Sequence, residues 1–201
     1  LVVVSAGEDA GRIEKRLALP FRPILIARMK FLNDKVVAIP NQNKLHFYDI
    51  TKTAIVGTAD LTHTIRDFYV ADDTIVATGE GKTSSFSLVK YDNAFNTQVL
   101  TSGGFSKSSD LGAAVAGMPR DASFVVISHL GEIKKLAKNG TITDSGRSNL
   151  KLGCATAKTN NSNGKLAVGC GRGDESVVIM DQELKQSIAL SATNSVVEVD
   201  L

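Results

Sequence analysis

Short runs of apolar residues, each followed by a polar turn, repeat along almost the whole chain. Three such runs, at residues 63–70, 74–79 and 85–92, follow one another closely. β-Branched and aromatic residues fill the runs, whereas Asp, Gly, Lys and Ser fill the turns, which is typical of short β-strands. We therefore predict three consecutive strands here.

The same pattern predicts strands in most of the remaining sequence. They fall at residues 1–6, 12–19, 24–32, 35–39, 45–49, 54–58, 97–101, 112–117, 124–128, 132–137, 141–143, 153–157, 165–170, 176–181, 186–190 and 195–201. The segment 12–17 could instead form a short helix, although Pro20 and Pro23 bracket it closely.

The predicted strands form a repeat of about four strands. The centres of the second strands, separated by 34, 39, 50 and 42 residues, are Val3, Val37, Val76, Val126 and Val168. Propeller blades repeat every 40–50 residues or so. These second strands are apolar on both faces, as expected for a sheet packed between two others. We predict an all-β fold: a β-propeller of four-stranded antiparallel blades, with about five blade units in one domain over residues 1–201.

Three predicted third strands end in a large residue followed by aspartate, namely Asp49, Asp92 and Asp181. This resembles the position of the dipeptide that names the WD-repeat family. His63 precedes Tyr91 by 28 residues, close to the place of the family's Gly-His pair. The resemblance implies structural roles for these four residues, with His63 hydrogen-bonded to a strand-end aspartate.

Residues 196–201 look like the first strand of a blade, and residues 1–4 look like a second strand. Joined, they would complete one blade from both ends of the chain and protect the exposed sheet edges. We expect either a closed five-bladed ring or part of a seven-bladed one. Because the chain starts inside a strand without Met, we also expect it to be a fragment.

Composition excludes few functions. The formal charge is only +2, which indicates neither a nucleic-acid nor a membrane partner. No apolar run approaches the roughly 20 residues of a membrane span, and no signal peptide is evident. Cys154 and Cys170 lie on neighbouring predicted strands, so a disulfide could form, but we favour two buried free thiols. That interpretation favours a reducing compartment, and we expect the protein to be cytoplasmic.

Motifs for nucleotide binding are incomplete. Residues 79–83 resemble the end of a phosphate-binding loop, but Val76 stands where the motif needs Gly, and a strand follows instead of a helix. The glycines of residues 169–173 lack the dinucleotide spacing. We interpret both segments as turns.

We predict no cofactor, no metal site and no enzymatic activity. The three histidines, His46, His63 and His129, have no Cys or carboxylate at ligand spacing. A propeller enzyme would need carboxylates or metal ligands facing the central channel, where we expect mainly Val, Ile and Ala. The lysines at 134, 135 and 138 fit a solvated strand edge, with an anionic partner as the alternative.

The second half resembles the second propeller of the actin-interacting protein 1 family. The segments that carry this resemblance are residues 111–115, 153–155, 166–171 and 177–179. It implies a protein-interaction scaffold that binds actin filaments decorated with cofilin and promotes their disassembly. The alternative is a guanine-nucleotide exchange propeller that acts on a small GTPase in vesicle trafficking.

Loops from successive blades would form a composite binding surface. We place partner contacts in residues 79–84, 102–110 and 171–176. The candidate partner-binding residues are Lys82, Thr83, Lys107, Arg172 and Asp174.

Overall fold

The computed structural model describes residues 2–4, 13–21, 29–107, 109–118, 120, 122–144, 153–171, 173–194, 196, 198 and 199. Every helix or strand assigned within them is a strand, which confirms the all-β prediction. The strands are β1 (Val2–Val4), β2 (Ile13–Arg16), β3 (Lys30–Phe31), β4 (Val36–Asn41), β5 (Lys44–Asp49), β6 (Ala54–Asp60), β7 (Thr64–Ala71), β8 (Thr74–Glu80), β9 (Phe86–Tyr91), β10 (Thr97–Gly103), β11 (Gly112–Met118), β12 (Ser123–Ser128), β13 (Ile133–Ala137), β14 (Ile142–Asp144), β15 (Cys154–Thr159), β16 (Leu166–Cys170), β17 (Gly173–Met180) and β18 (Gln186–Ala192).

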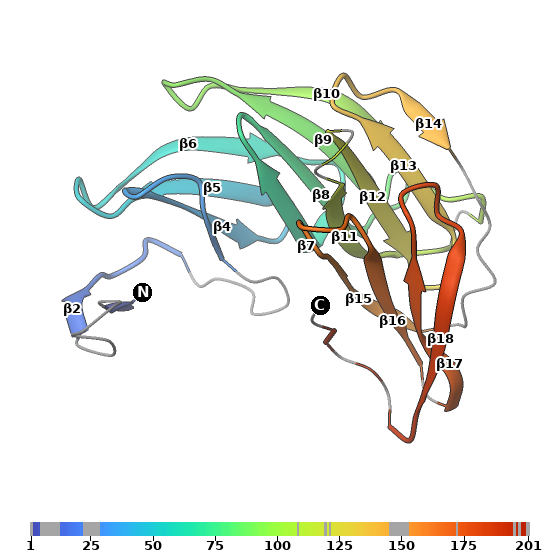
Figure 1. The fold of residues 1–201 in the computed structure, drawn as a ribbon. Helices are drawn as coiled ribbons and strands as arrows, with labels where there is room; N and C mark the ends of the chain where they lie inside the picture. Colours follow the sequence, from blue (N-terminus) through green and yellow to red (C-terminus); the bar gives the residue numbers. More distant parts are fainter. Residues whose placement is uncertain are drawn as a thin grey trace.

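Consecutive strands pair in antiparallel meanders of four. We name the sheets blade 1 (β3–β6), blade 2 (β7–β10), blade 3 (β11–β14) and blade 4 (β15–β18). Figure 1 shows the sheets arranged side by side in chain order. The described residues thus form four complete blades. β1 and β2 form a separate antiparallel pair, which agrees with the two strands predicted for the first unit at residues 1–6 and 12–19.

The cores lie between neighbouring blades, which explains why the second strands are apolar on both faces. All six residues of β12 are buried. Phe124 and Val126 belong to the core shared with blade 2, whereas Val125 and Ile127 belong to the core shared with blade 4. Each inner sheet is therefore held on both sides by apolar burial, as the sequence predicts.

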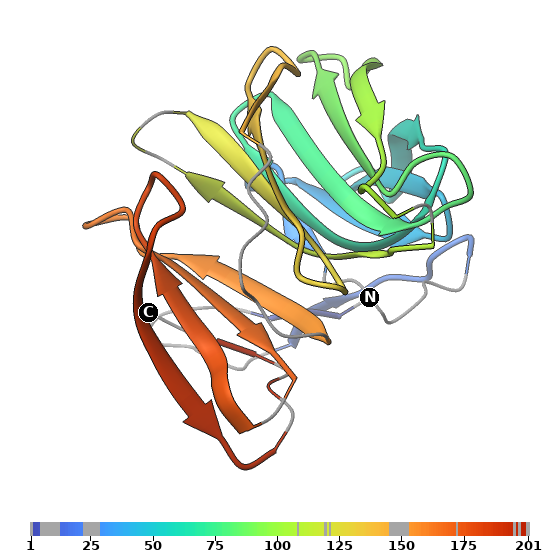
Figure 2. The ribbon, with the colours of Figure 1, turned by 90° about the vertical axis from the view of Figure 1, so that its right-hand side faces the viewer.

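The prediction of a closing strand at residues 195–201 is wrong for its described residues. Residues 196, 198 and 199 belong to no strand, and the Val196 amide donates to the Gly171 carbonyl at 2.8 Å. The methyl groups of Val196 and Val199 lie beside Gly169, so this segment packs on blade 4 (Figure 2). β1 pairs with β2 alone among the described strands, so the blade that both ends of the chain were expected to complete is not formed by the described residues.

The interpretation of the cysteines as free thiols is also wrong. Cys154 and Cys170 form a disulfide between β15 and β16. The two residues stand directly opposite each other in the strand register, so their side chains meet in the core. The sequence places them on adjacent strands but does not define that register. Because disulfides persist mainly in oxidising compartments, the argument for a reducing compartment loses its basis.

Two further predictions, the strand at residues 24–32 and the absence of a membrane span, can be compared with the structure only over the described residues. The strand predicted at residues 24–32 falls mostly outside the described residues, and its described part contains β3. Within the described ranges, no helix is long and apolar enough to cross a bilayer.

Candidate partner-binding surface

Successive turns of an antiparallel meander lie at alternate ends of the sheet. The turns β4–β5, β8–β9, β12–β13 and β16–β17 therefore lie at the same end of their blades as the links β6–β7 and β10–β11. We call this the connection end. The predicted contact residues Lys82 and Thr83 belong to the β8–β9 turn, and Lys107 belongs to the β10–β11 link.

The structure brings these three residues together around one cavity of about 260 Å³. The side chains of Lys82, Thr83 and Lys107 are exposed at its rim. The other residues that line it are Gly81, Ser84, Ser85, Gly104 and Phe105. We call this hollow the lysine cavity.

Hydrogen bonds fix the walls of the lysine cavity. The Ser85 amide donates to the Gly103 carbonyl at 2.8 Å, and the Ser85 hydroxyl donates to the Asp110 carbonyl at 3.1 Å. The Ser106 amide and hydroxyl donate to the Glu132 carboxylate at 2.7 and 2.9 Å, which ties the β10–β11 link to blade 3. The surface is thus preorganised by contacts between turns of different blades.

The other two predicted contact residues do not join the lysine cavity. Asp174 is exposed within β17, where its Oδ1 accepts a hydrogen bond from the Ser191 hydroxyl at 3.0 Å. The loop predicted at residues 171–176 is shorter than expected, because β17 already starts at Gly173. The strand register shifts between Gly173 and Val177, where Glu175 has a φ of 56°. Arg172 lies outside the described residues.

The three strand-end aspartates each organise the turn that follows the third strand of a blade. Asp49 Oδ1 accepts from the Thr51 amide, the Thr51 hydroxyl and the Lys52 amide at 2.8, 2.6 and 2.9 Å. Asp92 and Asp181 accept from backbone amides two and four residues ahead. The Thr51 hydroxyl and the Lys52 amide lower the pKa of Asp49, and the Asn96 side chain and amide lower the pKa of Asp92.

His63 is buried at the connection end, with 2% of its surface exposed. Within the described part of the chain, neither ring nitrogen has a hydrogen-bond partner, so the predicted bond to a strand-end aspartate is absent. The aspartates lie at the opposite ends of the blades, beyond the reach of this ring. Burial lowers the pKa of His63 to about 4, so the ring stays neutral near pH 7.

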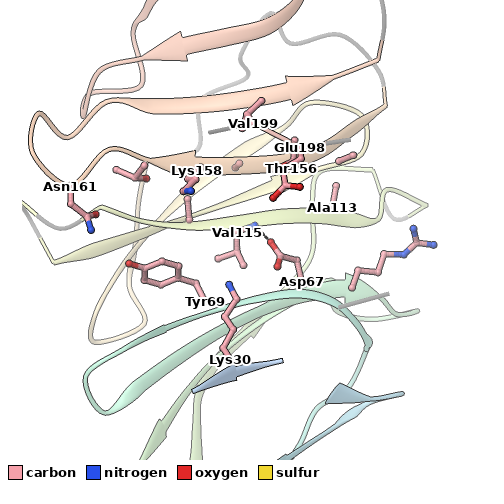
Figure 3. Close-up of a pocket in the computed structure, with 15 residues that line it drawn as sticks. Lys30, Asp67, Tyr69, Ala113, Val115, Thr156, Lys158, Asn161, Glu198 and Val199 are labelled. Carbon is pink, nitrogen blue, oxygen red and sulfur yellow. Dashed lines mark hydrogen bonds between the residues drawn. The ribbon is translucent and has the colours of Figure 1, made fainter. Parts of the chain in front are cut away.

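A larger cavity of about 520 Å³ lies along the inner strands of all four blades (Figure 3). Figure 3 shows Lys30, Asp67 and Tyr69 on one side of it and Thr156 and Lys158 on the other. The expectation of a lining made mainly of Val, Ile and Ala is therefore wrong. The sequence signal was the alternation of polar residues with alanines along β15, where Thr156 and Lys158 follow Ala155 and Ala157.

We call this larger hollow the axial cavity. Beside it, Asp67 connects blade 2 to blade 3. Its Oδ2 accepts the Val115 amide of blade 3 at 2.9 Å, and its Oδ1 accepts the Phe68 amide at 2.9 Å. The Lys30 ammonium lies 5.4 and 5.5 Å from the ring centres of Phe68 and Tyr69. These contacts bind neighbouring blades to one another.

The turn interpretation of the motif at residues 79–83 is confirmed. These residues end β8 and begin the turn to β9, so no helix follows that could present its N-terminus to a phosphate. Among the described residues, no group of three or more His, Cys, Asp or Glu side chains could hold a metal ion.

Comparison with known proteins supports the propeller architecture. No protein-family model and no curated protein sequence matches the chain. The β-propeller domain of Cps50 (Swd1) from Myceliophteria thermophila aligns with a TM-score of 0.55 and 8% identity, over 68% of this chain and 44% of that one.

Two further structures align more extensively with this chain. Raptor from Chaetomium thermophilum gives a TM-score of 0.71 and 11% identity, over 90% of this chain and 18% of that one. The computationally designed Ika8 protein gives a TM-score of 0.65 and 14% identity, over 84% of this chain and 49% of that one. The chain thus spans less than half the length of each. These likenesses and the blade topology confirm a β-propeller fold. None of the three is actin-interacting protein 1, so that resemblance stays a prediction.

Proposed function

We propose that this protein is a non-catalytic interaction scaffold that binds protein partners at the connection end. The observation that carries the proposal is the lysine cavity, where exposed residues from a turn and a link meet on hydrogen-bonded walls. Propeller folds present loops from several blades on one rigid surface, which suits recognition of a folded or extended partner.

The test compares the two ends of the blades. One variant carries Gln42→Tyr, Thr83→Tyr and His129→Tyr, all exposed at the connection end. The matched control carries Lys35→Tyr, Asn93→Tyr and Lys165→Tyr at the opposite end. Each protein is used in quantitative affinity purification from an extract of its native cells. We expect at least one protein to be retained by the wild type and the control but lost from the connection-end variant. Retention that depends instead on the opposite end would contradict the proposal.

The actin assignment is a finer hypothesis supported by the sequence resemblance of the second half. It requires the folded chain to pellet with actin filaments, and more strongly when cofilin is present. Absence of pelleting by a folded chain would remove this hypothesis and leave the general scaffold. The exchange-factor alternative instead requires faster release of labelled GDP from a small GTPase.

A cytoplasmic location belongs to the same proposal. Fluorescence microscopy of the tagged chain, together with the redox state of Cys154 and Cys170 in cells, tests it. An oxidised pair in living cells would argue for an oxidising compartment instead.

A further inference from the structure

The two lysines of the lysine cavity have no acidic partner in the described part of the chain. Lys82 and Lys107 form no ion pair there. Several other exposed or half-exposed lysines do have carboxylate partners, namely Lys44, Lys52, Lys90, Lys138 and Lys185. The exposed Lys35 and Lys165 form no ion pair among the described residues, but they do not share a cavity with another lysine. The rim of this cavity therefore carries two unpaired positive charges close together, on a chain whose formal net charge is only +2.

The acidic residues near the lysine cavity already have partners. Glu80, two residues before Lys82, is paired with Arg66 at 3.2 Å. Asp110 is buried, and its Oδ1 accepts the Leu130 amide at 3.1 Å. Glu132 accepts from Ser106 and lies 3.7 Å from the Lys134 ammonium. None of the described residues that line the lysine cavity carries a carboxylate. An external acidic group would therefore meet the lysines without competition from the cavity walls.

The base of the cavity offers an apolar contact and space for a backbone. The Phe105 ring is mostly buried and packs edge-on against Phe86, with centroids 5.8 Å apart. At Gly104, an added Cβ would lie 4.0 Å from its nearest neighbour, the Thr83 carbonyl, so this wall is open. An extended peptide could place its backbone here and its side chains on the rim.

We propose that the lysine cavity captures an acidic segment of a partner protein, a proposal that rests on the scaffold function above. Carboxylates of the segment pair with Lys82 and Lys107, while an apolar residue between them contacts Phe105. Two lysines suit a short peptide better than a nucleic acid, which normally engages a longer basic track. Phe105 is 7% exposed and packs edge-on against Phe86, which leaves little ring surface on which bases could stack.

The test uses a fluorescein-labelled peptide of eight glutamates with one central Phe, and the same peptide with Gln in place of Glu. Binding is measured by fluorescence anisotropy with the whole chain at low and high salt. The variant is Lys82→Glu/Lys107→Glu. The matched control, Lys35→Glu/Lys165→Glu, makes the same charge change at exposed positions of the opposite end.

We expect the acidic peptide to bind more tightly than its Gln counterpart and to weaken as salt increases. The double variant at the cavity should lose about tenfold or more in affinity, whereas the control should change less than about twofold. Equal losses in both variants, or equal binding of the Gln peptide, would overturn the proposal. Tighter Lys82-dependent and Lys107-dependent binding of single-stranded RNA or of phosphatidylserine vesicles would also overturn it.

The outcome is separable from that of the scaffold proposal. If the tyrosine variant of the connection end loses a partner while the Lys82→Glu/Lys107→Glu variant retains it, the scaffold function stands and the acidic segment is excluded. If neither variant loses a partner and the acidic peptide still binds at the cavity, the cavity chemistry stands and the scaffold function is excluded.

Discussion

Single aspartates hold the turns between the third and fourth strands of blades 1, 2 and 4. In each case one carboxylate replaces the backbone partners that a tight turn cannot supply. The role follows from residue type and place: an acceptor directly after a strand meets the amides of the next two to four residues. This is the physical basis of the repeated aspartates in the sequence.

Replacing Asp49 tests this role. Asp49→Ala removes an acceptor from three donors and should lower the free energy of unfolding by about 2 kcal/mol at pH 7. Asp49→Asn keeps Oδ1 and should lose less. The folded-state pKa of Asp49 is below 3.8, so its contribution is full above that value and is lost as pH falls further. Urea denaturation at pH 7 and pH 3 measures both effects, and a constant difference at the two pH values would contradict the argument.

His63 should make the fold sensitive to mild acid. Its pKa is 6.5 when unfolded and about 4 when folded, so only the unfolded chain gains a proton between these values. The free energy of unfolding should therefore decrease as the pH is lowered from 6.5 to 4, by up to about 3 kcal/mol from this group. His63→Leu should show a shallower decline from pH 6.5 to 4.5, whereas the exposed control His129→Gln should follow the wild type. Equal slopes for all three proteins in urea titrations would refute the assignment.

The strands themselves could be predicted closely, because their signals are local. The predicted strands 74–79 and 54–58 correspond to Thr74–Glu80 and Ala54–Asp60. Apolar alternation and turn residues act within a few positions, so each strand can be predicted from its own residues and the turns beside it. The strand predicted at residues 195–201 does not form at its described residues 196, 198 and 199, although the segment is equally apolar, because a strand also needs an edge to pair with. That partner is a distant part of the chain, and no local pattern encodes it.

The disulfide between β15 and β16 is a second feature that the local sequence pattern does not encode. Cys154 and Cys170 could be placed on adjacent strands from the sequence, but the register that makes them direct neighbours emerges only in the folded sheet. Free thiols and a disulfide therefore could not be distinguished by spacing.

The disulfide itself can be tested by counting thiols. In denaturant without reductant, the chain should expose no reactive thiol to Ellman's reagent, and it should expose two after reduction. Cys154→Ala/Cys170→Ala should lose about 3 kcal/mol, because the bond closes a loop with a sequence separation of 16. Wild type treated with reductant should approach the stability of the double variant. Two free thiols in the untreated protein would restore the interpretation made from the sequence.

At the scale of the whole molecule, the candidate surfaces arise where blades meet. Lys82 and Lys107 could be chosen from the sequence because both lie in polar loops, and the structure unites them because those loops share one end of blade 2. The axial cavity could not be predicted in the same way. Its walls come from β3, β7, β11 and β15, and their polar residues become neighbours only after the blades assemble.

Close contact between blades should therefore control the stability of the whole array, and Gly112 offers the sharpest test. It lies in β11 of blade 3, where an added Cβ would stand 1.8 Å from the Thr78 hydroxyl and 2.5 Å from the Ser85 carbonyl oxygen of blade 2. Gly112→Ala must push the two blades apart and should cost about 2 kcal/mol or more. Gly104→Ala is the matched control, since its Cβ has open space, and it should change stability by less than about 0.5 kcal/mol.

Thermal unfolding followed by circular dichroism compares the two alanine variants. If the blades pack as the structure describes, Gly112→Ala should lower the Tm by several degrees and should also weaken peptide binding at the lysine cavity. The second effect follows because Ser85 belongs both to the wall of that cavity and to the contact with Gly112. An unchanged Tm would mean that blades 2 and 3 are not packed closely here. A lower Tm with intact peptide binding would show that the cavity forms within blade 2 without support from blade 3.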